Sequence, residues 1–98
     1  MLRYLFLVVI VAASPALAAD GDNGRRLALT HCAACHAVTP LARGEVAAAP
    51  PFDEISRRFG FDAGAILLVI SGPHQKMNFS PPPREANDLA AYIATLQR

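Results

Sequence analysis

The stretch Cys32-Ala33-Ala34-Cys35-His36 decides how this chain of 98 residues is interpreted. Its two thiols are the only cysteines in the sequence, they stand three positions apart, and an imidazole follows directly. A helical turn brings residues at this spacing to one side of the backbone. We therefore expect two sulfurs and one ring nitrogen to lie together at a single point of the chain.

Three interpretations of the cysteines compete with attachment of a cofactor. A thioredoxin-like redox pair requires a βαβ context, and the sequence has no strand signals. A zinc site would need two of His31, His36 and His74, but their spacing does not match the usual C-x-x-C…H-x-x-x-H pattern. A disulfide between residues three apart closes too small a loop to stabilise a fold by much.

C-x-x-C-H is the attachment signature of c-type haem. Each thiol can add to one vinyl group of the same porphyrin, and the next residue is then held under the iron. We therefore expect one covalent haem c, bonded through Cys32 and Cys35 and ligated by His36. Such a group would also provide a core for a chain too small to build a large one.

A second axial ligand is expected from Met77, the single methionine beyond the first residue. It lies 41 residues after His36 in a proline-rich loop. Ligation by Met and His raises the reduction potential and suits electron transfer. One alternative is that Met77 only fills a gap in the core. The other is ligation by His74, which would leave Met77 without a role.

A metal-bound histidine normally donates its second ring N–H to a fixed acceptor. Residues 49–52 read Ala-Pro-Pro-Phe, a rigid turn whose carbonyl groups are not used by a helix. We expect the carbonyl of Pro50 to accept this bond from His36. The alternative is that the prolines only kink the loop.

Apolar periodicity elsewhere predicts an all-α chain with four short helices. Loops rich in proline and glycine separate them, at residues 37–51 and 73–83. The expected helices run from a cap at Asp22 or Asn23 to about Cys35, over 52–59, from a cap at Asp62 to about Ile70, and from about Pro83 to the C-terminus.

The first eighteen residues have the pattern of a secretory signal. Arg3 is followed by an apolar stretch from Tyr4 to Ala13 and by the small-residue end Ala16-Leu17-Ala18. The apolar stretch is too short to span a bilayer comfortably. We expect cleavage after Ala18, which leaves residues 19–98 as one exported domain without stable membrane insertion. An uncleaved anchor or a core helix is the alternative.

The charge of the exported part excludes one class of partner. Residues 19–98 keep eight of the nine basic residues and all eight acidic ones, so their formal net charge is close to zero. No basic stripe or run is present. Nucleic acid is therefore not expected as a partner.

Over about residues 21–97 the chain resembles the class I, mitochondrial-type cytochrome c family. The family's first helix has a glycine eight residues before the first cysteine, as Gly24 stands here, and its last helix carries L-x-x-Y-[LI], as residues 89–93 do here. The resemblance implies the cytochrome c fold, with the two helices crossing where Gly24 faces Tyr92. It also implies that Pro50-Pro51-Phe52 is the turn that supports the haem histidine, and that Met77 lies in the methionine loop.

Two positions depart from the family pattern. Ala28 stands where an aromatic residue is common, and Asn78 follows the methionine where proline is common. The interval from His36 to Met77 is shorter than in the mitochondrial proteins and is similar to that of compact bacterial members.

These expectations describe four short helices wrapped around one covalent haem. We expect a monomeric, periplasmic carrier of single electrons that meets its donor and acceptor proteins transiently and is not an enzyme. Two alternatives are a dedicated haem subunit of a periplasmic oxidoreductase and a haem-based gas sensor. Co-purification with a dehydrogenase would identify the first, and binding of carbon monoxide to the reduced protein would identify the second.

Overall fold

The computed structural model describes residues 4, 6–10, 18–42, 44, 48–74 and 79–96. In this part of the chain the fold is all-α, as expected, with four α-helices and no strand. The elements are α1 (Gly21–His31), the short 3-10 turn η1 (Pro40–Ala42), α2 (Phe52–Arg58), α3 (Ala63–Ser71) and α4 (Pro83–Ala94).

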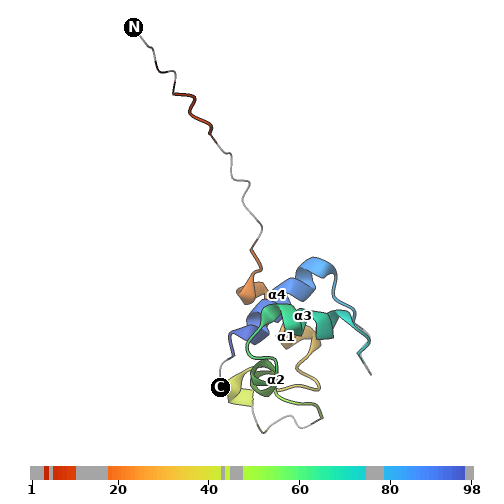
Figure 1. Cartoon of the computed structure of the whole chain (residues 1–98). Coiled ribbons are helices and arrows are strands. Elements are labelled where there is room, and N and C mark those ends of the chain that lie inside the picture. Colours follow the sequence, from red (N-terminus) through yellow and green to blue (C-terminus); the bar gives the residue numbers. More distant parts are fainter. Residues whose placement is uncertain are drawn as a thin grey trace.

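One described stretch ahead of α1 lies apart from the helices. Residues 6–10 are exposed and lie away from the helical part of the molecule (Figure 1). No helix in the described ranges is both long and apolar enough to cross a membrane.

The starts of the helices were predicted with mixed success. Asp62 caps α3 as expected, accepting hydrogen bonds from the N–H groups of the second and third residues of the helix. Pro83 is the first residue of α4, also as expected, because a proline there loses no helical hydrogen bond. The cap of α1 was predicted wrongly. It is Asp20, whose side chain accepts from the N–H of Asn23 at 3.1 Å.

Two helices end earlier than expected. The N–H groups of Cys32 and Ala33 both donate to the carbonyl of Ala28, which interrupts the hydrogen-bond ladder of α1 at His31 instead of at about Cys35. At the other end of the chain, the hydroxyl and the N–H of Thr95 both donate to the carbonyl of residue 92. These bonds close α4 at Ala94, short of the C-terminus.

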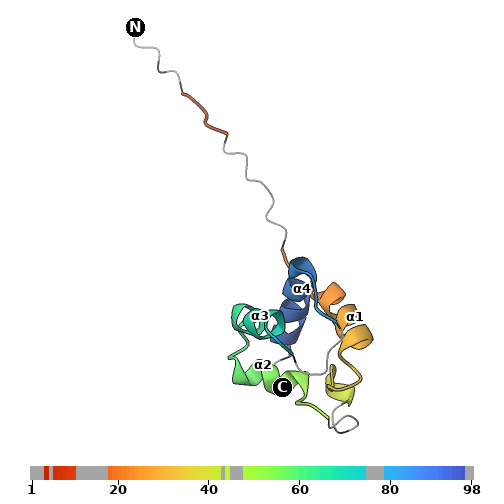
Figure 2. The same ribbon diagram turned by 90° about the vertical axis from the view of Figure 1, so that its right-hand side faces the viewer.

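The helix α4 is the central element of the fold. It packs most extensively against α1, then against α3, and less against α2. Figure 2 shows α1 and α3 on either side of it. The buried apolar core gathers around α4 and consists of Ala28, Val38, Phe52, Ile66, Leu89, Ala90, Tyr92 and Ile93.

Gly24 permits the close crossing of α1 and α4. A Cβ atom at this position would lie 1.9 Å from the carbonyl oxygen of Asp88 and 2.9 Å from the Cβ of Tyr92. Gly24 therefore faces Tyr92, as the sequence resemblance implied. The Tyr92 hydroxyl in turn donates to the carbonyl of Val38 at 2.5 Å and holds the segment that follows His36 against α4.

Asp88 joins the same two helices by hydrogen bonds. Its carboxylate is almost fully buried and accepts from the backbone N–H of Asp20 at 2.7 Å and from the side-chain amide of Asn23 at 2.9 Å. These bonds, first the one from Asp20 and then the one from Asn23, hold the pKa of Asp88 below its usual value. The start of α1 is thereby fixed to the middle of α4.

Replacing Gly24 tests the crossing. We expect Gly24→Ala to lower the free energy of unfolding by about 3 kcal/mol, because the new methyl group overlaps backbone atoms of α4 that cannot move aside. The matched control is Gly21→Ala in the same helix, where a Cβ meets nothing within 4 Å. The control should change stability by no more than about 1 kcal/mol. Equal denaturant midpoints for the two variants would contradict a close crossing at Gly24.

Acid titration tests the Asp88 contact. Because the pKa of Asp88 is lowered in the folded state, its contribution to stability is present above the unfolded value of about 3.9 and is lost as the pH falls through the folded pKa. Below about pH 4, the unfolding free energy of Asp88→Asn should therefore decline less steeply than that of the wild type. Asp22→Asn, which removes an exposed carboxylate from α1, should follow the wild type. Parallel curves for Asp88→Asn and the wild type would refute the contact.

Candidate functional site

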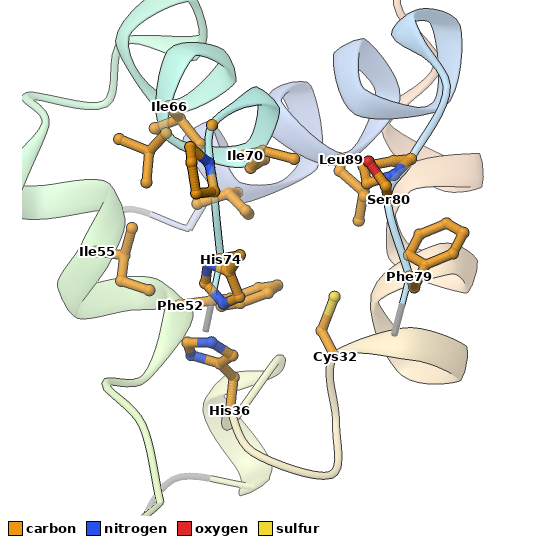
Figure 3. Close-up of a pocket in the computed structure, with 15 residues that line it drawn as sticks. Cys32, His36, Phe52, Ile55, Ile66, Ile70, His74, Phe79, Ser80 and Leu89 are labelled. Carbon is orange, nitrogen blue, oxygen red and sulfur yellow. The ribbon is translucent and has the colours of Figure 1, made fainter. Parts of the chain in front are cut away.

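An open, mainly apolar pocket lies where α2, α3 and α4 face the turn that follows α1 (Figure 3). Its empty space, counted out to and including the open mouth, is about 900 Å³. The walls from the three helices are formed by Phe52, Ile55, Ile66, Val69, Ile70, Leu89 and Ile93. Two imidazoles and one thiol are the polar groups of interest among the remaining lining residues.

The two cysteines differ in position. Cys32 is half-buried and lines the pocket, with its sulfur directed inward (Figure 3). Its burial raises the pKa of its thiol above the ordinary value. Cys35 is exposed and does not line the pocket. Both are free thiols, so the structure places one of the two expected attachment points at the pocket and the other outside it.

His36 lines the pocket and is held in one orientation. Its side chain is 9% exposed, and its Nδ1 lies 2.6 Å from the carbonyl oxygen of Pro50, which is the hydrogen bond expected from the sequence. A carbonyl oxygen only accepts, so Nδ1 must carry the proton. The lone pair of the neutral ring is then on Nε2, the nitrogen left free to bind a metal.

The residues around His36 explain why it is fixed. Pro50 precedes a second proline, which restricts it to extended backbone conformations and holds its carbonyl in place. The N–H of Phe52 donates to the carbonyl of Ala37 at 2.9 Å and joins the start of α2 to the segment after His36. The ring of Phe52, 4% exposed, lies 5.1 Å from the imidazole between ring centroids.

His74 lies across the pocket from His36. It follows the end of α3, is exposed, and has its ring centroid 6.0 Å from that of His36 with 35° between the planes. Figure 3 shows the two rings one above the other in the pocket. From sequence, His74 was considered as a zinc ligand and as a competitor for the role of Met77, and a loop or surface hydrogen bond was the role expected for it. Met77 itself lies outside the described residues, so its predicted role as a ligand stays a prediction.

A second aromatic contact was missed from the sequence. His31, at the end of α1, stacks on Phe79, with centroids 3.7 Å apart and 7° between the planes. Phe79 also lines the pocket, so this stack fastens one wall to α1. No sequence signal pointed to it, because the two residues are far apart in the chain and Phe79 belongs to no periodic pattern.

The lining fits a large, flat, apolar group held by sulfur and nitrogen. The walls are hydrocarbon, a thiol points inward at one side, and an oriented imidazole stands at the base with its free nitrogen available. Within the described ranges, no three His, Cys, Asp or Glu side chains gather as a site for a bare metal ion.

A double-mutant cycle tests the stack between His31 and Phe79. We expect a coupling energy of about 0.5–1.5 kcal/mol between His31→Ala and Phe79→Leu, measured from the free energies of unfolding. His31→Phe should retain most of the stability, because it keeps a flat ring at the contact. Strictly additive effects of the two substitutions would show that the rings do not interact.

Comparisons with protein-family models, with curated proteins and with solved structures found no match. A function must therefore be inferred from the residues of the pocket and from their geometry.

Proposed function

We propose that the pocket holds one haem, bonded through Cys32 and Cys35 and ligated by His36 and Met77. The protein would then be a monohaem c-type cytochrome that carries single electrons in the periplasm. The observation that carries this proposal is the hydrogen bond from His36 to Pro50 beside the inward-facing thiol of Cys32.

The chain's own residues account for the binding of such a group. The carbonyl of Pro50 fixes the tautomer of His36, orients its ring and makes Nε2 a better donor. The apolar side chains of α3 and α4 would exclude water from the flat faces of the haem and give it surroundings of low polarity. When bound, the haem iron supplies reversible one-electron chemistry. Met77 joins the site only by the sequence prediction.

The class I cytochrome c fold is part of the same proposal. Two contacts expected from the sequence are present, namely Gly24 against Tyr92 and His36 with Pro50. Both support the resemblance. The three-part pattern of residues 1–18 supports export, and cleavage after Ala18 would release residues 19–98 into the periplasm.

The surface suits transient partners. With a formal balance near zero, long-range electrostatic steering of donor and acceptor proteins should be weak. Docking would rely on a small neutral patch, as in other short-lived redox encounters. Val69 lines the pocket and is 44% exposed, which places apolar surface at its mouth.

Covalent attachment can be tested on protein matured in a host that has a haem-attachment system. After denaturation, the pyridine adduct should show a haem whose colour stays with the polypeptide in acidified solvent. Cys35→Ala should shift this spectrum, because one vinyl group then remains unsaturated. Cys32→Ala combined with Cys35→Ala should release all the colour. Colour that extracts from the wild-type polypeptide would contradict the proposal.

The role as a carrier can be tested on the same preparation. A redox titration should follow a one-electron Nernst curve, with a slope of about 59 mV per tenfold ratio. The reduced protein should resist carbon monoxide, because both axial positions are occupied. Rapid binding of carbon monoxide by the wild type would favour a gas-binding role over electron transfer.

A further inference from the structure

His74 lies at the pocket, and few contacts hold it there. The ring contact with His36 is the sole interaction that it makes within the described part of the chain. It is exposed, and it forms no hydrogen bond with another residue of the described ranges. Its position over the pocket therefore leaves an unengaged imidazole facing the one that is anchored by Pro50.

The separation of the two rings has the size of a shared metal site. Two imidazoles on opposite sides of one metal ion, with metal–nitrogen distances of about 2.0–2.1 Å and about 1.1 Å from nitrogen to centroid, have their centroids ~6.3 Å apart. The observed 6.0 Å is close to this value. By comparison, the stacked rings of His31 and Phe79 are 3.7 Å apart. His36 and His74 are thus farther apart than stacked rings, at a centroid separation close to that of two imidazoles on one metal ion.

Met77 stands three residues after His74 in the sequence, and its predicted role as a ligand rests on the sequence alone. One open position opposite His36 cannot hold both. We propose that His74 is an alternate axial ligand, which binds the iron opposite His36 whenever the thioether of Met77 does not. This inference rests on the proposed haem site. The imidazole of His74 would keep the iron six-coordinate when the thioether of Met77 is not bound.

The exchange changes ligands and transfers no electron. An imidazole nitrogen replaces a thioether sulfur on the iron, and no bond within the protein chain is broken. Because Met/His ligation raises the reduction potential, the form with two imidazoles should have the lower potential of the two. The site would also stay closed to small exogenous ligands.

The test compares Met77→Ala, His74→Ala and the double variant, each matured with haem. In the oxidised state, Met77→Ala should remain low-spin by electron paramagnetic resonance, whereas the double variant should become high-spin. The apparent affinity of reduced Met77→Ala for carbon monoxide should be at least about tenfold weaker than that of the double variant, because the open form is then a tenth or less of the population. The midpoint potential of Met77→Ala should lie below that of the wild type.

His31→Phe combined with Met77→Ala is the matched control. It removes a histidine outside the pocket while keeping a ring against Phe79, so it should stay low-spin like Met77→Ala. If Met77→Ala does not mature, alkylation of Met77 in the finished wild-type protein removes the thioether instead, and the same measurements apply.

The proposal would be overturned if Met77→Ala were high-spin and bound carbon monoxide as readily as the double variant, with its haem still covalent. That outcome leaves the proposed haem site intact. Failure of the haem site itself would appear separately, as absence of covalent haem from the wild type. If His74→Ala alone opened the iron, His74 would be the ligand at rest, which supports the inference and contradicts the predicted role of Met77.

Discussion

The close crossing of α1 over α4 is the constraint on which the rest of the structure depends. Gly24 lets the backbones meet at Asp88, and the buried carboxylate of Asp88 then fastens the start of α1 from the other side. That crossing sets the direction of α1 relative to α4, and so the position of its C-terminal end. It delivers Cys32 to the rim of the pocket, and the turn that follows delivers His36.

The pocket exists because the helices contact one another only in part. α4 packs against each of the other helices, yet the apolar side chains of α2 and α3 also line an open space instead of meeting across it. A chain of 98 residues buries only a modest share of its surface, so an unfilled apolar space lowers its stability. The bond from His36 to Pro50 also fixes one imidazole of the pocket lining in a single orientation.

Local signals predicted the parts of the fold that depend on local chemistry. Asp62 and Pro83 mark helix starts by their own side chains. The C-x-x-C-H motif singled out Cys32 and His36, which line the pocket, and Cys35, which does not. The contact between Gly24 and Tyr92 came from the resemblance to class I cytochromes c. The cap at Asp20 was missed because several polar residues in a row can cap a helix, and the choice among them is made by packing against α4.

Long-range contacts could not be predicted from the sequence. Nothing in the pattern of residues paired Asp88 with Asn23, stacked His31 on Phe79, or set His74 opposite His36, because each pair joins segments that meet only after folding. Their alignment depends on the crossing of α1 and α4 and on the loop after α3. The inward thiol of Cys32 and the exposed thiol of Cys35 likewise differ because the turn between them leaves the helix early.

The central claim is that the occupant of this pocket is a haem bonded to the chain. The mass of the intact, exported protein under denaturing conditions tests it most directly. We expect the mass of residues 19–98 plus one haem, with no thiol left to react with an alkylating reagent. A mass equal to the polypeptide alone, with two reactive thiols or one disulfide, would contradict the claim.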